Sequence, residues 1–180
     1  DDIDVPPVTA EMSAFRTIEA EKYSGFGGIS IKEENGAKFI TECDDQDYVK
    51  YDGVGFEDGA KSITLTVRSN KESYIELALG LVSGETVQEI QIPNTNGEWR
   101  TVTCELNTVI SGTNNVVFRF RTNNQESSEL VDIDSFVFDY KYQISNKNWT
   151  AKASHNSSAA SSAFDRDSAT RWNSSYQTGN

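Results

Sequence analysis

Residues 16–140 are a succession of short segments in which polar and apolar residues alternate, with turn residues between one segment and the next. In one of them, Ile63, Leu65 and Val67 alternate with polar residues. Successive side chains of a strand point to opposite faces, so each segment buries one face and exposes the other. The pattern predicts an all-β sandwich, because neither a parallel βαβ rhythm nor a long amphipathic helix is visible.

The charge of the chain restricts its partners. The formal net charge is −12, whereas 36% of the residues are hydrophobic and 11% are aromatic, which is enough for a packed core. Affinity for nucleic acid comes mainly from lysine and arginine, so a nucleic-acid partner is not expected, and neither is an acidic membrane surface. A neutral polysaccharide or a cation fits this balance, although acidic surfaces often serve solubility alone.

The chain divides into a long domain and shorter flanking pieces. Residues 1–13 are interpreted as a linker, since they lack the basic start and apolar stretch of a signal peptide. No run of about 18 apolar residues is present, so no membrane insertion is expected. We assign the sandwich to residues 14–142, a connector to 143–148 and a separate fragment to 149–180. Cys43 and Cys104 permit one disulfide or two thiols, and free thiols are favoured because a full core does not need a disulfide.

Four sequence blocks carry a family resemblance. In chain order they are RTIEAEKYSGFGG, FITECDDQDYVKYDGVGF, IPNTNGEWRTVTCEL and LVDIDSFVF. Together they resemble a family 6 carbohydrate-binding module over residues 16–140. The resemblance implies a jelly-roll β-sandwich of the galactose-binding-domain type. It also implies a non-catalytic domain that binds polysaccharide, with xylan or β-glucan as the commonest ligand types.

A second resemblance begins at residue 149. The stretch WTAKASHNSSAASSAFDRDSATRWNSS is similar to the first quarter of a discoidin-like domain of the factor V/VIII C-type, also classed as family 32 of the carbohydrate-binding modules. It implies an incomplete second β-sandwich with a partial calcium loop at Asp165, Asp167 and Thr170, followed by a core tryptophan at Trp172. The 32 residues from Trp149 to Asn180 are too few to bury a core of their own.

Two pairs of acidic residues suggest a metal site. Within a strand, Glu19 and Glu21 would project from one face about 7 Å apart, and Asp132 and Asp134 repeat this spacing. If the first and last strands pair, these acids converge and favour a hard cation such as Ca2+. Solvated pairs on exposed faces are the alternative. The family 6 resemblance implies a structural calcium at Glu19, Glu21 and Asp134.

Aromatic residues are the candidates for sugar contacts. A sugar ring packs its C–H face on a flat aromatic side chain, while its hydroxyls need polar partners at the edge. Trp99 follows an Asn-Gly turn and precedes a predicted strand. The resemblance implies a loop cleft in which Trp99 and Phe39 flank one sugar ring. Ordinary core packing of both aromatics is the alternative.

The same resemblance supplies the polar residues of that cleft. It implies Glu33, with Glu34 as a one-residue shift, and Asp132 as acceptors of sugar hydroxyl hydrogens. Phe39 stands where the family usually has tyrosine, and Asp132 replaces an amide and only accepts hydrogen bonds when ionised.

Some family members have a second binding surface on the sheet, where an aromatic corresponds to Tyr48. Here Leu77 or Ala78 stands where an acid would be wanted. This second surface is therefore given less weight than the loop cleft.

The favoured function is a monomeric, non-catalytic module that anchors a secreted bacterial glycoside hydrolase to polysaccharide. The catalytic domain would be elsewhere in the same parent polypeptide. A calcium-held structural or adhesive domain of a bacterial surface protein is the alternative. A remote alternative is a glycoside-cleaving domain with Glu33 and Asp132 as acid and base. His155 is the only histidine, so no Ser-His-Asp arrangement is expected in the first domain.

Overall fold

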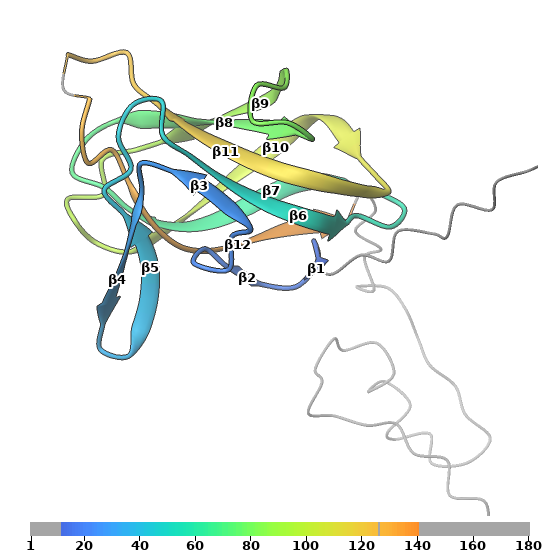
Figure 1. Cartoon of the computed structure of the whole chain (residues 1–180), viewed down its shortest axis with the longest axis horizontal. Coiled ribbons are helices and arrows are strands. Elements are labelled where there is room, and N and C mark those ends of the chain that lie inside the picture. Colours follow the sequence, from blue (N-terminus) through green and yellow to red (C-terminus); the bar gives the residue numbers. More distant parts are fainter. Residues whose placement is uncertain (1–11, 126, 141–180) are drawn as a thin grey trace, which may run out of the picture. The chain divides into compact units, whose positions relative to one another are not determined.

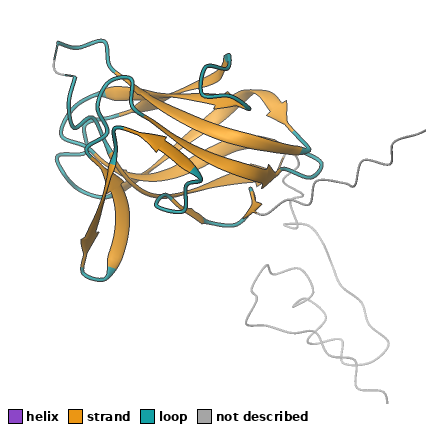
Figure 2. Ribbon diagram, viewed as in Figure 1, coloured by secondary structure: helices purple, strands orange, loops and turns teal. Residues whose placement is uncertain are grey.

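The computed structural model describes residues 12–125 and 127–140. These residues form twelve strands and no helix (Figures 1 and 2). The predicted all-β class is therefore confirmed. The expected linkers and the discoidin-like fragment, with its candidate ligands Asp165, Asp167 and Thr170, lie outside the described residues. None of the described residues belongs to a helix that is long and apolar enough to cross a membrane.

The strands form two six-stranded sheets. The first has the order β1–β6–β11–β8–β9 with β3 also paired to β6, and the second has the order β10–β7–β12–β5–β4 with β2 also paired to β12. Only β1 runs parallel to its partner among the described pairs. The first sheet consists of β1 (Met12–Ser13), β3 (Gly25–Gly27), β6 (Tyr48–Gly55), β8 (Ser73–Leu79), β9 (Thr86–Ile92) and β11 (Thr113–Arg121). The second consists of β2 (Ile18–Glu19), β4 (Ser30–Glu34), β5 (Ala37–Thr41), β7 (Ala60–Arg68), β10 (Arg100–Ile110) and β12 (Asp132–Tyr140).

The core lies between the two sheets, where the predicted apolar faces meet. Ile63, Leu65 and Val67 of β7 are fully buried, as their alternation predicts. An aromatic cluster fills the centre: the Tyr51 ring is 4.8 Å from Phe136 between centroids, and Phe118 is 4.9 Å from Phe136. Burial of each large apolar side chain contributes about 2–3 kcal/mol. This core fixes the strand ends that carry the site.

β2, the strand that carries Glu19, pairs with the last described strand β12, as the metal hypothesis requires. β2 runs antiparallel to β12, with Glu19 opposite Ser135, and the N–H of Ala20 donates to the carbonyl of Asp134 at 2.8 Å. Both cysteines are free, which confirms that expectation: Cys43 is buried and Cys104 is half-buried.

Candidate functional site

One row of side chains crosses the outer face of the second sheet near the end of β7. Asp132 of β12 lies opposite Arg68 of β7, and Ile133 lies opposite Ile40 of β5. Ile40 and Ile133 are buried in the core, so their neighbours Thr41 and Asp132 project from the other face. The strand register therefore brings Thr41, Asp132 and Arg68 side by side.

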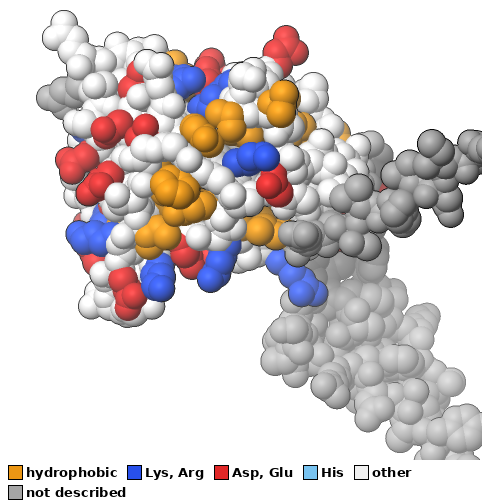
Figure 3. Space-filling view, in the orientation of Figure 1, with side chains coloured by type: hydrophobic (Ala, Val, Ile, Leu, Met, Phe, Trp, Pro, Cys, Tyr) orange, Lys and Arg blue, Asp and Glu red, His pale blue; other side chains and the backbone are white. Residues whose placement is uncertain are grey.

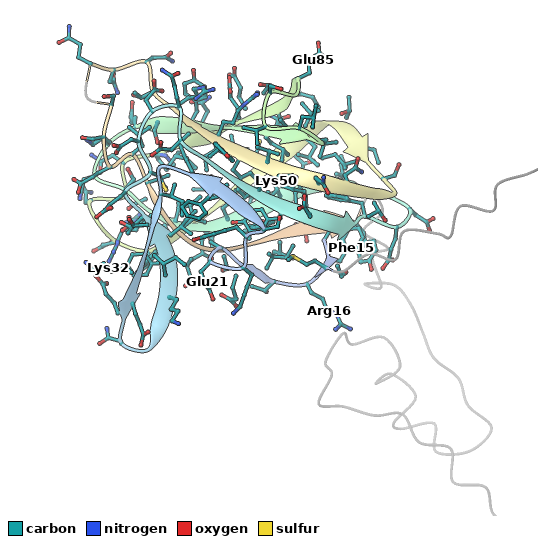
Figure 4. The ribbon with its side chains drawn as sticks, viewed as in Figure 1. Phe15, Arg16, Glu21, Lys32, Lys50 and Glu85 are labelled. Carbon is teal, nitrogen blue, oxygen red and sulfur yellow. The ribbon has the colours of Figure 1, made fainter. Side chains whose placement is uncertain are left out.

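Arg68 is the centre of a network of charged hydrogen bonds. Its Nε and Nη2 donate to Oδ2 of Asp132 at 2.9 and 2.7 Å, and its Nη1 donates to Oε2 of Glu34 at 3.0 Å. The other Asp132 oxygen accepts from the Thr41 hydroxyl at 2.6 Å. Glu34 also pairs with Nζ of Lys32 at 2.9 Å (Lys32 is labelled in Figure 4). Acids and bases are thus matched within the network.

The electrostatics follow from these contacts. Burial opposes the charge of Arg68, but its hydrogen bonds to Glu34 and Asp132 outweigh burial and raise its pKa. Hydrogen bonds from Lys32 and then from Arg68 lower the pKa of Glu34. The side chains of Arg68 and Asp132 are only 20% and 21% exposed, so this pair is well shielded from solvent. Asp132 and Glu34 therefore help to keep Arg68 charged.

Arg68 also lies against two aromatic rings. Its guanidinium carbon is 4.8 Å from the Phe39 ring centroid and 4.7 Å from the Trp99 ring centroid. The two rings are 5.2 Å apart and meet edge to face at 75°. Phe39 is 2% exposed, yet it does not belong to the core cluster between the sheets, whereas Trp99 is 38% exposed. Phe39 is therefore covered by Trp99 and Arg68 on the outer face of the sheet, and it supports both side chains.

This arrangement differs from the expected sandwich of a sugar between Phe39 and Trp99. A flat ligand between two rings requires about 3.5–4.0 Å of contact distance on each side. The two rings are already in contact, and Arg68 fills the angle between them. Phe39 and Trp99 do lie together as expected, but the Arg68 guanidinium occupies the place that was expected for the sugar.

Glu33 does not join the site. It lies opposite Lys38 in the β4–β5 pair, whereas Lys32 lies opposite Phe39. Side chains alternate along a strand, so Glu33 points away from the face that carries Phe39, and Glu34, the one-residue alternative, reaches Arg68. Glu33 and Asp132 thus share no face and form no acid–base pair.

The sequence analysis did not predict Arg68 as a residue of the site. It is the last polar-side residue of the alternating segment that became β7, and such a position normally holds a solvated charge. Only the pairing of β7 with β12 shows that it faces an acid.

Two hollows border this network. One of about 240 Å³ is lined by Thr41, Arg68, Asp132 and neighbouring loop residues. The other, about 550 Å³, is a shallow hollow lined by Thr66, Trp99, Arg100 and Thr101. On the face that Figure 3 shows, acidic and basic side chains are interspersed and form no continuous basic patch.

The acids of the β2–β12 seam lie close enough to repel one another. Burial, then the charges of Asp134 and Glu21, raise the pKa of Glu19. The Glu21 side chain is 13% exposed, and its buried Oε2 has no hydrogen-bond partner (Glu21 is labelled in Figure 4). Within residues 12–125 and 127–140, however, no three carboxylate, histidine or cysteine side chains converge into a ready-made metal site.

Tyr48 lies on the outer face of the first sheet, in register with Gly27 and Arg119. Its ring covers Gly27, where any Cβ would collide with it. The next residue in this row is Glu76, whose Oε2 is 2.9 Å from Nε of Arg119. An acid is therefore present one residue before Leu77, but it is already paired with arginine.

Comparison with known proteins agrees with this architecture. Residues 19–140 match the family 6 carbohydrate-binding module. The fold superposes with a TM-score of 0.64 on CsCBM6-3 from Clostridium stercorarium in complex with cellobiose, at 27% identity, covering 72% of this chain and 96% of that one. A β-1,3-glucan binding CBM6 from Bacillus halodurans also gives a TM-score of 0.64, at 31% identity, with 71% and 97% covered.

A curated relative shows the setting in which such a domain occurs. The chain is 28% identical over 137 residues to endo-1,4-beta-xylanase A of Thermoclostridium stercorarium, covering 73% of this chain but 20% of the xylanase. The chain thus spans about one fifth of that protein. The match of 122 consecutive positions, the jelly-roll sandwich and these relatives together establish that the chain belongs to family 6 of the carbohydrate-binding modules, which are non-catalytic.

Proposed function

We propose that this domain binds a neutral β-linked polysaccharide of the xylan or β-glucan type, and that Trp99 provides the main contact. The observation that carries the proposal is an indole ring that is 38% exposed and is held in place by Phe39 and Arg68. A pre-positioned aromatic surface loses little conformational freedom when a ligand packs on it. The named ligands of the relatives, cellobiose and β-1,3-glucan, belong to this class.

The charge pattern around Trp99 supports a neutral ligand. Lys32, Arg68, Glu34 and Asp132 compensate one another within the network. An acidic sugar would have to compete with two carboxylates for Arg68, whereas a neutral sugar needs only C–H contact and hydroxyl partners. Neutral glycans are therefore the first candidates.

We also propose that the parent protein is a secreted bacterial glycoside hydrolase that this module anchors to its substrate. Support comes from the xylanase relative, of which the matched region is only 20%. The discoidin-like resemblance of residues 149–180 adds a proposal of a second sugar-binding-type domain in the same parent. Sequencing the whole gene tests both points.

A structural calcium at Glu19, Glu21 and Asp134 is part of the proposal. Two observations support a hard cation there: Glu21 has a buried oxygen without a partner, and Glu19 is repelled by both other acids. When bound, the ion would neutralise the acids where β2 meets β12 and so stabilise the pairing of these strands. No step of sugar binding depends on it.

Affinity electrophoresis of the full chain tests the proposed function. Native gels containing xylan, cellulose-derived soluble glucan or β-1,3-glucan would be run with calcium, beside gels without polysaccharide. We expect at least one of these polysaccharides to retard the protein, while serum albumin migrates equally in all gels. Equal migration in every gel would contradict a polysaccharide-binding function of this class.

A further inference from the structure

We propose that the sugar binds on the outer side of Trp99, in the hollow lined by Thr66, Arg100 and Thr101, and that Arg68 closes the space between Trp99 and Phe39. This inference rests on the proposed function, since it places the glycan of that function on a particular surface. Thr66 belongs to β7, Arg100 and Thr101 begin β10, and Trp99 directly precedes β10.

The first argument is that the space between the aromatic rings is occupied. The Arg68 guanidinium lies within 5 Å of both ring centroids, at 4.8 and 4.7 Å. Its three hydrogen bonds to Asp132 and Glu34 hold it there. A sugar would enter only by expelling Arg68, which would leave the largely buried Asp132 carboxylate without its charged partner.

The hollow beside Trp99 is lined by threonine side chains that can bond to sugar hydroxyls. Thr66 and Thr101 lie directly opposite each other on β7 and β10, and both line this hollow of about 550 Å³. The next pair on the same face is Thr64 and Thr103, whose hydroxyls are 2.8 Å apart. Each threonine offers a hydroxyl donor and acceptor beside a methyl group. A hydroxyl-lined track thus extends from the indole along the outer face.

This track has the dimensions for a chain of sugars rather than for a single ring. Side chains on one face of a strand repeat about every 6.6–7 Å, so the positions of Trp99 and Thr103 are about 13–14 Å apart, which is longer than one sugar ring. Thr101 and Thr103 are exposed, and Arg100 at the margin is paired with Glu98 at 3.0 Å. The surface therefore suits a neutral, extended oligosaccharide.

Calorimetry on the full chain with three probes, xylohexaose, cellohexaose and laminarihexaose, tests this placement. The double variant Thr66→Val, Thr101→Val removes both hydroxyls while keeping side-chain shape. We expect it to weaken binding of the preferred hexasaccharide by about tenfold or more, which corresponds to about 1.4 kcal/mol. Thr108→Val is the matched control, because Thr108 is an exposed threonine of β10 that lines neither hollow, and it should change affinity less than about threefold. Thermal melts of each variant establish that it is folded.

The outcomes separate the two proposals. If Trp99→Ala loses binding but the Thr66, Thr101 double variant binds as the parent does, the outer placement is wrong and the proposed function stands. Weakening by Thr108→Val as strong as that by the double variant would also contradict the outer placement. If Trp99→Ala binds as tightly as the parent, or if the parent binds none of the three probes, both proposals fail.

Discussion

Replacing Phe39 by alanine tests whether this ring supports the site or contacts the ligand. The ring is 2% exposed and is covered by Trp99 and Arg68 at centroid distances of 5.2 and 4.8 Å. Truncating a buried phenylalanine costs about 3–5 kcal/mol, and the lower end applies where the cover can relax. Because the cover here consists of two side chains rather than backbone, we expect a loss of about 3 kcal/mol in the free energy of unfolding. Phe39→Leu keeps much of the apolar volume and should cost about 1 kcal/mol.

Guanidinium unfolding of the full chain, followed by far-ultraviolet circular dichroism, measures both losses. Glycan affinity would be measured in parallel at a temperature where both variants are folded. A supporting ring predicts that Phe39→Leu keeps its affinity within about threefold. Two results would refute this reasoning: an alanine variant within about 0.5 kcal/mol of the parent in stability, or a leucine variant that is fully stable but no longer binds.

Three further predictions concern the rest of the domain. The melting temperature of the parent should be higher in calcium than in chelator, and Glu21→Gln should abolish most of this difference. Equal melting temperatures of the parent in calcium and in chelator, with no metal found by elemental analysis, would contradict the site. Because the pKa of Glu19 is raised in the folded protein, its contribution to stability in chelator is fully present below its usual pKa and is lost as pH rises through the raised value. Glu19→Gln should flatten that decline in a series of melts against pH. Tyr51→Phe removes a buried hydroxyl that donates at 2.8 Å to a backbone carbonyl, and should lower the free energy of unfolding by about 1–2 kcal/mol, with glycan affinity unchanged.

Alternation and turn signals were sufficient to predict an all-β sandwich. Ile63, Leu65 and Val67 of β7 are buried as their period-two pattern predicts, and Ile75 and Leu77 of β8 follow the same rule. The strand that carries Glu19, β2, also pairs with the last strand β12 as expected, with Glu19 opposite Ser135. These features depend on local sequence and on burial of one face, which a single sequence reports well.

The faces of individual site residues were harder to predict, because a shift of one residue moves a side chain to the other side of its strand. This accounts for Glu34, rather than Glu33, reaching Arg68. It also accounts for the acid on the outer face near Tyr48, which is Glu76 rather than a residue at 77 or 78.

The role of Arg68 depends on tertiary pairing. Its acidic partners Asp132 and Glu34 are 64 and 34 residues away in the chain. Nothing in the local sequence distinguishes it from Arg119 or Arg121, which also occupy the polar side of an alternating strand. The occupied space between Phe39 and Trp99 was therefore visible only once the strands were placed.

If Trp99 carries the binding of a neutral β-linked glycan, Trp99→Ala must weaken that binding strongly. Calorimetry of the full chain would use the polysaccharide that retards it most, with Trp99→Phe as the variant that keeps an aromatic face. Loss of the indole should cost on the order of 2 kcal/mol, which is about thirtyfold in affinity, and phenylalanine should recover part of this loss. An alanine variant that is folded and binds within about twofold of the parent would contradict the claim.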